Sequence, residues 1–272
     1  MGRRWRARRP VAKASLTTWH DQRVPPTTTT AVGIDLAWGP HGRTGLAAVT
    51  VDGTLTAMDT VATDAEIEQW LSAHTSGACI VAFDAPLVVR NASGMRDCER
   101  QVSRRFGSRQ ASCYPSNRAN RNFADGGRAW NLATRLDLDT ALEPAGDRRA
   151  IEVYPHAAIV SLFNLPTVLR YKKGRGRTVA DRQSELLALL DHVESLSDAT
   201  PPLRVAASAQ WRSSRGAVED ATHPMHLNAV EDAIDAVVCA YVALLMLGDP
   251  ARVESFGNEE TGAIMVPLPP AN

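Results

Sequence analysis

Cysteine is scarce in this chain, and its apolar runs are short. The four cysteines, Cys79, Cys98, Cys113 and Cys239, form no C-x-x-C pair, and no histidine stands at zinc-finger spacing. This pattern excludes a disulfide scaffold and a structural zinc site, and it favours a reducing, cytoplasmic compartment. The longest apolar run, residues 236–247, is shorter than the ~20 residues that a membrane-spanning helix needs. We therefore expect a cytoplasmic protein with no membrane partner.

Neither sign of charge is in excess, because 30 Lys and Arg residues balance 30 Asp and Glu residues. The overall charge therefore does not indicate a nucleic-acid partner, although its distribution along the chain does. Hydrophobic residues make up 44% of the sequence, which excludes a chain that is disordered throughout. A chain of 272 residues fits one or two domains and can bury a core without a metal or disulfide.

The N-terminal segment lacks the apolar stretch of a secretory signal. It has clustered Arg residues, a Pro pair and four consecutive Thr residues instead. We expect a disordered basic leader over residues 1–30, either a phosphate-binding arm or a poorly ordered extension. A transit peptide for an organelle is a second interpretation of the same composition. The folded domain is expected over residues 31–268.

The residue pattern predicts a definite order of elements in the folded part. We expect strands and helices over residues 31–38, 45–51, 55–61, 63–74, 79–84, 150–154, 155–162, 179–193 and 228–247. An Asp-Gly pair at 52–53 predicts a hairpin, residues 90–135 form an Arg-rich insertion, and a last hairpin is expected near Ser255 and residues 264–266. This order is that of the ribonuclease H-like fold. The prediction is an α/β protein with a mixed five-stranded sheet, three antiparallel strands plus two parallel ones, flanked by helices.

Asp35 and Asp84 each end a strand that is otherwise apolar. A carboxylate in such a place is costly unless it has a partner or a chemical purpose. A turn at the end of each strand is the alternative explanation. In the expected fold the two strands are adjacent and parallel, so the two aspartates would lie side by side.

The last expected helix adds further acids. Asn228 and Glu231 have the spacing of a capping box, which would explain Glu231. Asp232 and Asp235 share a face of this helix, and the residues beyond them are apolar almost all round. Acids in the first helical turns also interact well with the helix dipole. That effect explains Asp232 better than Asp235, which lies next to core residues.

Grouped carboxylates predict a site for hard metal ions. Such groups repel one another unless a cation is present, and oxygen ligands suit Mg²⁺ or Mn²⁺. Two such ions about 4 Å apart can activate a water and stabilise a leaving oxygen in phosphodiester hydrolysis. Glu152, on the strand at 150–154, is a candidate for a further ligand or a base, or for a partner of an arginine.

Four short segments, spread through the sequence, resemble one known family. They are Gly33-Ile-Asp-Leu-Ala-Trp38, Ala82-Phe-Asp-Ala-Pro86, Glu152-Val-Tyr-Pro-His156 and Glu231-Asp-Ala-Ile-Asp-Ala236. Together with residues 94–99 and 114–117 they are similar to the family called domain of unknown function 429, over about residues 31–266. That family is described as predicted ribonuclease H-like nucleases. The resemblance implies a metal-dependent nuclease in which Asp35, Asp84 and Asp235 are metal ligands and Asp232 assists. The Asp232-x-x-Asp235 spacing is also similar to that of Holliday-junction resolvases.

Basic side chains gather in two stretches around these acids. The insertion at 90–135 and the loop near residue 173 supply the candidate phosphate-binding residues Arg96, Arg100, Arg104, Arg105, Lys172, Lys173 and Arg175. The alternative is a solvated face whose charges pair with acids elsewhere. Aromatic residues do not alternate with these arginines, so stacking on single strands is not indicated.

The sequence therefore predicts a metal-dependent nuclease that hydrolyses nucleic acid with two carboxylate-bound ions of Mg²⁺ or Mn²⁺. Asp35, Asp84, Asp232, Asp235 and Glu152 are its candidate catalytic residues, and DNA and RNA are equally compatible with the pattern. Two alternatives stay open. One is an inert nucleic-acid or protein-binding module on the same fold. The other is a nucleotide-binding phosphotransferase of the actin and sugar-kinase type, which would need Gly-rich phosphate loops and a second domain.

Overall fold

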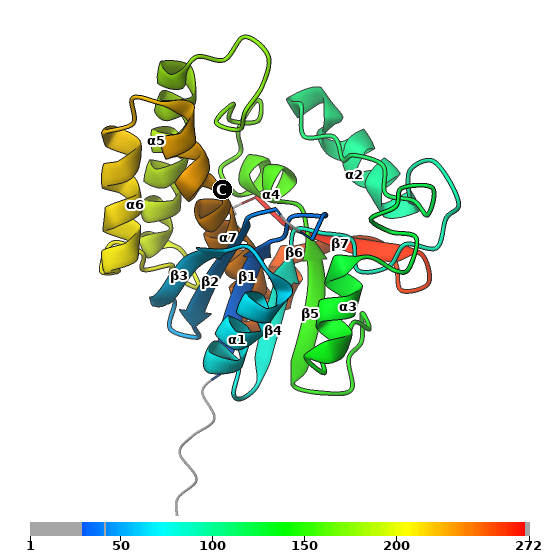
Figure 1. The fold of residues 1–272 in the computed structure, drawn as a ribbon. Coiled ribbons are helices and arrows are strands. Elements are labelled where there is room, and N and C mark those ends of the chain that lie inside the picture. The colour runs from blue at the N-terminus through cyan, green and yellow to red at the C-terminus, as the bar shows by residue number, and fades with distance from the viewer. Residues whose placement is uncertain (1–28, 41, 270–272) are drawn as a thin grey trace, which may run out of the picture.

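The computed structural model describes residues 29–40 and 42–269, so the expected basic leader lies outside the described residues except for its last two positions. The described chain forms a mixed sheet of seven strands in the order β3-β2-β1-β4-β5-β7-β6 (Figure 1). The strands are β1 (Thr30–Asp35), β2 (Thr44–Thr50), β3 (Leu55–Val61), β4 (Cys79–Phe83), β5 (Arg148–Val153), β6 (Val253–Asn258) and β7 (Gly262–Pro267). The helices are α1 (Asp64–His74), α2 (Asp97–Phe106), α3 (Arg128–Arg135), α4 (Pro155–Leu162), α5 (Val179–Ser195), α6 (Ala209–Glu219) and α7 (Pro224–Gly248).

The first half of the sheet has the predicted topology. β1, β2 and β3 form an antiparallel meander, and the turn between β2 and β3 places Gly53 at a φ of 87°. Glycine adopts this conformation without steric cost, which is why the Asp-Gly signal identified the hairpin. β4 then pairs in parallel with β1, and β5 pairs in parallel with β4. The prediction that the first and fourth strands are adjacent and parallel is therefore confirmed.

The sheet has seven strands and not the five that the sequence analysis predicted. The extra strands are the C-terminal hairpin, in which β6 and β7 pair antiparallel. The hairpin itself was expected, but its place was not. β7 joins the edge of β5 in parallel through the pairs Glu152–Ile264 and Val153–Met265. A parallel contact between strands so far apart in the chain leaves no turn signal, because no short loop connects them.

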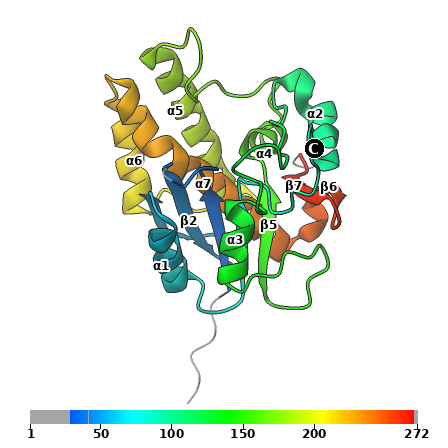
Figure 2. The ribbon, with the colours of Figure 1, turned by 45° about the vertical axis from the view of Figure 1, so that its right-hand side comes forward.

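Helices cover both faces of the sheet. α1 and α3 lie on the face turned towards the viewer in Figure 1, where Ile67 and Leu132 pack with Ile34 and Phe83. α7 lies on the opposite face, and α5 and α6 pack beside it (Figure 2). α7 is apolar nearly all round because it is enclosed between the sheet and these helices. In the described ranges, no helix combines the length and the apolar character needed to cross a membrane.

Two predictions about the C-terminal helices were wrong. α7 begins at Pro224 and not at Asn228, since Pro is well suited to the first helical position and His223 caps it. The capping box of Asn228 and Glu231 therefore does not form, and Glu231 pairs instead with Arg182 at 2.8 Å. Residues 197–227, expected as a connection, contain α6. That helix includes Ser and Gly residues of low propensity, and burial of Trp211 stabilises it.

Candidate active site

Asp35 ends β1, and Asp84 comes directly after β4, the parallel strand beside it. Ile34 of β1 pairs with Phe83 of β4, and the amide of Asp84 donates to the carbonyl oxygen of Ile34 at 2.8 Å. The next residue on each strand is the aspartate. Because successive side chains point to opposite faces, both carboxylates project to the face that α7 covers. The two residues therefore lie side by side, as the sequence predicts.

Two glycines allow α7 to approach this edge of the sheet. A Cβ atom on Gly33 would lie 1.9 Å from the carbonyl oxygen of Ala236, and one on Gly45 would lie 1.9 Å from the carbonyl oxygen of Asp232. No larger residue fits at either position unless the helix moves. The close approach therefore brings Asp232 and Asp235 of α7 to the carboxyl end of β1.

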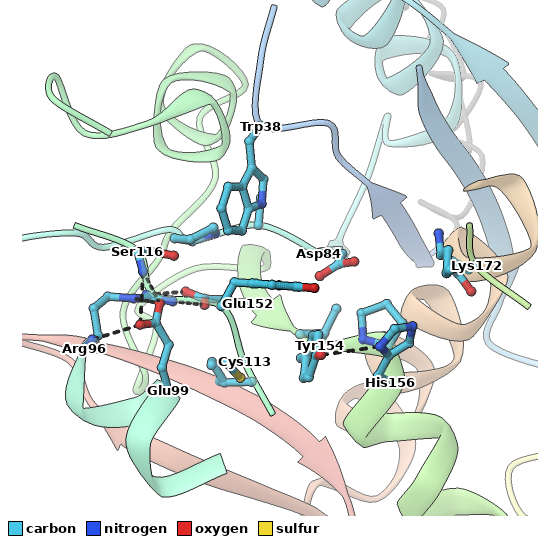
Figure 3. Close-up of a pocket in the computed structure, with 17 residues that line it drawn as sticks. Trp38, Asp84, Arg96, Glu99, Cys113, Ser116, Glu152, Tyr154, His156 and Lys172 are labelled. Carbon is cyan, nitrogen blue, oxygen red and sulfur yellow. Dashed lines mark hydrogen bonds and ion pairs between the residues drawn. The ribbon is translucent and has the colours of Figure 1, made fainter. Parts of the chain in front are cut away.

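The Lys172 ammonium lies between these acids. Its Nζ atom is 2.5 Å from Oδ2 of Asp235, 3.1 Å from Oδ2 of Asp35 and 3.7 Å from Oδ1 of Asp232. Asp84 lines the adjoining cavity, and within the described chain its carboxylate forms no hydrogen bond or ion pair (Figure 3). We call Asp35, Asp84, Asp232 and Asp235 the acidic cluster. Three of its members converge on a single cation.

Buried contacts fix the loop that carries Lys172. Tyr171 is fully buried, and its hydroxyl donates to Oδ1 of Asp235 at 2.7 Å. Arg182 donates to the carbonyl oxygen of Tyr171 at 2.7 Å, and Arg177 donates to that of Lys172 at 2.6 Å. These contacts hold the loop against α5 and α7, and they fix the position of the Lys172 ammonium group.

The acidic cluster holds more negative charge than Lys172 balances. Burial raises the pKa of Asp35 to about 7; Lys172 opposes this shift, and Asp235 and Asp232 add to it. Burial and the neighbouring charge of Asp35 raise the pKa of Asp84 well above its ordinary range. For Lys172, burial favours the neutral amine, but Asp235 and Asp35 outweigh it and raise the pKa well above its usual value. The site would accept a further positive charge.

The donor chemistry fits a divalent cation, with one condition. All four side chains offer carboxylate oxygens, and three of them already surround one positive charge. Oxygen ligands of this kind suit Mg²⁺ or Mn²⁺. However, in the described part of the chain no three acidic, His or Cys side chains are spaced as a ready metal site. Lys172 fills the centre, so a metal ion would have to displace its ammonium group or share the cluster with it.

Glu152 lies outside the acidic cluster, contrary to its expected role. It pairs with Phe83 in the β4–β5 register, so it projects to the opposite face from Asp84. Arg96 holds it there with nitrogen–oxygen distances of 2.5 and 2.9 Å, and the amide of Leu87 donates to it at 3.0 Å. Arg96 also binds Glu99 at 2.7 Å and is 3% exposed. Arg96 is therefore not placed to bind phosphate. Of the alternatives expected for Glu152, the structure has the pairing with an arginine.

The other basic candidates occupy two separate places. Arg104 and Arg105 are exposed on α2, and Arg100 on the same helix pairs with Asp97 at 3.1 Å. Lys173 and Arg175 are exposed on the loop between α4 and α5. Figure 1 shows α2 and this loop on either side of the sheet's upper edge. One further cation was not predicted: Arg43 lies 3.6 Å from Asp232.

A cavity of about 280 Å³ opens beside the acidic cluster. Asp84, Asp235 and Lys172 line one part of it, and Trp38, Tyr114 and Tyr154 are among its other lining residues. His156 also lines it. Burial lowers the pKa of His156, so its ring favours the neutral form.

Sequence reasoning missed Tyr171 and the aromatic lining of the cavity. Tyr171 stands next to a predicted phosphate-binding lysine, yet only the tertiary structure shows that its hydroxyl reaches Asp235. Trp38, Tyr114 and Tyr154 come from separate segments of the chain, so no local pattern joins them. All three residues do fall within segments that carry the family resemblance, and this was the one available signal.

A comparison with protein families supports that resemblance. The model of the family described as "Protein of unknown function (DUF429)" matches residues 33–261. No curated protein matches the chain. The family match includes the second half of β1, β4, the loop of Lys172 and the acids of α7, and thus every member of the acidic cluster. The chain belongs to the DUF429 family.

Proposed function

We propose that the protein is a metal-dependent nuclease with a ribonuclease H-like fold. The strand order β3-β2-β1-β4-β5, with the first three strands antiparallel and β1, β4 and β5 parallel, supports this fold. The strongest single observation for the function is the convergence of Asp35, Asp232 and Asp235 on one cation, with Asp84 at the next register position. Acids from two parallel strands and one helix meet at the same edge of the sheet.

The chain's own residues have separable roles in this proposal. The acidic cluster would hold Mg²⁺ or Mn²⁺, which when bound would supply an activated water and charge stabilisation for the leaving oxygen in phosphodiester hydrolysis. Tyr171 orients Asp235 through its hydrogen bond at 2.7 Å. Lys172 balances part of the negative charge of the cluster while no metal is bound. Glu152 takes no part in binding the metal.

The exposed basic residues position the nucleic acid. Arg104 and Arg105 on α2 and Lys173 and Arg175 on the loop between α4 and α5 are exposed and can approach phosphates. Contacts of this type do not read the base sequence. Nucleic acid is therefore the proposed partner, and the cleavage experiment below distinguishes DNA from RNA.

One observation favours a second candidate function. Because an ammonium group already occupies the centre of the acidic cluster, the same site is compatible with an inert binding module that never takes up metal. In that case Lys172 would be a permanent replacement for the ion.

The test is Mn²⁺-dependent cleavage of labelled DNA, RNA, hybrid and branched substrates. Asp35→Asn and Asp84→Asn should each lower the rate at least about a hundredfold, because each removes a charged ligand. Asp59→Asn, an exposed aspartate on β3, is the matched control and should retain the wild-type rate. Absence of cleavage together with absence of Mn²⁺-linked thermal stabilisation would favour the binding module.

A further inference from the structure

The cavity beside the acidic cluster is built from distant parts of the chain. Its lining comes from the loop after β1, the loops after β4 and α2, the end of β5, the start of α4 and the loop of Lys172. Figure 3 shows Trp38 on one wall and Tyr154 on the wall across from it, with Asp84 between them at one end. A substrate group that enters this cavity therefore lies directly beside the proposed metal-binding residues.

The walls are flat and largely apolar. Trp38, Tyr114 and Tyr154 present aromatic rings, and Pro86 and Pro155 add apolar surface. The Tyr154 hydroxyl donates to the carbonyl oxygen of Ser112 at 3.0 Å, so this ring is fixed in place. Tyr114 is 75% exposed, so its ring is open to contact by a ligand. Such a lining suits a planar, polarisable ligand.

The polar groups at the end of the cavity away from the acidic cluster already have hydrogen-bond or ion-pair partners. Arg96 binds both Glu99 and Glu152, and the backbone amide of Ser116 donates to Glu99 at 3.1 Å. The Asp84 carboxylate at the near end remains free to accept hydrogen bonds. Because acids outnumber bases around the cavity, a bare phosphate is repelled from it, whereas an uncharged group with N–H donors is not.

We propose that this cavity binds one unstacked nucleobase of the substrate, next to the phosphodiester bond that the acidic cluster acts on. This inference rests on the proposed nuclease function and names the substrate more closely. A cavity of about 280 Å³ that opens beside the acidic cluster suits a group of the size of one base. The base stacks against Trp38 and Tyr114, and its exocyclic N–H groups face Asp84. The substrate is therefore single-stranded or locally unpaired at the cleaved position.

The probe for this pocket is an uncharged nucleoside in the presence of EDTA. Calorimetric titration of the full chain with adenosine, guanosine, cytidine and uridine should detect binding of at least one, whereas ribose alone should not bind. Tyr114→Ala should weaken that affinity at least about fivefold, since stacking on an aromatic ring contributes substantially per base. Trp130→Ala removes an exposed aromatic residue that does not line the cavity and should leave the affinity unchanged.

A second titration separates the pocket from the nuclease proposal. Mn²⁺ should strengthen binding of a nucleoside monophosphate and leave nucleoside binding unaltered, and Asp35→Asn should abolish the difference. Nucleoside binding, together with monophosphate binding that Mn²⁺ does not strengthen, would support the pocket and contradict the nuclease. Mn²⁺-linked stabilisation with no nucleoside binding, or equal weakening by Tyr114→Ala and Trp130→Ala, would overturn the nucleobase pocket alone.

Discussion

Nζ of Lys172 lies 2.5 Å from Oδ2 of Asp235, and the same carboxylate accepts a hydrogen bond from Tyr171 at 2.7 Å on its other oxygen. Asp235 is 1% exposed, so these two partners take the place of water around its carboxylate. Lys172 thereby acts as a cation supplied by the chain at the centre of the acidic cluster. Replacement of Lys172 by an uncharged residue should leave the negative charge of the acidic cluster uncompensated.

Lys172→Met should destabilise the protein in EDTA by about 3 kcal/mol, because it leaves buried carboxylates without their partner. The same variant should bind Mn²⁺ more tightly, since the ammonium no longer competes with the ion. Thermal unfolding with and without Mn²⁺ measures both effects. Lys173→Met, at the exposed neighbouring position, should change neither. A variant that loses stability and cannot be rescued by Mn²⁺ would show that Lys172 is a permanent replacement for a metal.

The pH dependence of stability follows from Asp35. Its pKa rises from 3.8 to about 7 on folding, so between these values the native state binds the extra proton. The free energy of unfolding of the metal-free protein should therefore fall as pH rises from about 4 to about 7. Mn²⁺ affinity should increase over the same range, because the metal needs the ionised carboxylate. Asp35→Asn should make the stability profile in urea unfolding less steep, with Asp84 still contributing a slope of the same sign; an unchanged profile would contradict the raised pKa of Asp35.

Gly33 is predicted to be required for the shape of the site. Gly33→Val would place side-chain atoms where α7 lies, and the overpacking should cost about 3 kcal/mol or more. Displacement of α7 would also move Asp232 and Asp235 away from β1, so Mn²⁺ affinity should fall as well. Gly146→Val serves as the control, because a Cβ atom there meets nothing within 4 Å. Chemical denaturation and Mn²⁺ titration of the two variants give the comparison.

The Arg96–Glu152 pair is expected to stabilise the fold without acting on the metal. Glu152→Gln should lower the free energy of unfolding, because a buried guanidinium loses part of its charge compensation. Its Mn²⁺ affinity should remain that of the wild type, unlike the affinity of Asp84→Asn. A loss of Mn²⁺ binding in Glu152→Gln at unchanged stability would instead restore the role that the sequence suggested for Glu152.

Local signals were sufficient to predict the half of the fold that carries the acids. Apolar strands ending in Asp35 and Asp84, with an Asp-Gly turn between two other strands, identify β1 to β4. The family match confirms the resemblance that these segments carry. The roles assigned to the acids stay predictions.

Long-range relationships could not be obtained in this way. The attachment of β7 to β5, the pairing of Glu152 with Arg96 and the approach of Lys172 to Asp235 each join residues far apart in the sequence. Glu152 shows the consequence most clearly. It ends a strand much as Asp35 and Asp84 do, yet its register turns it to the other face of the sheet. A shift of one residue in the register therefore decides whether such an acid joins the acidic cluster or forms a structural ion pair on the other face.

The most direct test of the account is to measure Mn²⁺ bound to the purified protein by electron paramagnetic resonance at pH 8. We predict saturable binding by the wild type, a loss of at least about tenfold in affinity in Asp35→Asn and in Asp84→Asn, and wild-type affinity in Asp59→Asn. Binding that is equally strong in all four proteins would place the metal elsewhere. No binding, even in Lys172→Met, would contradict the claim that the acidic cluster is a metal site.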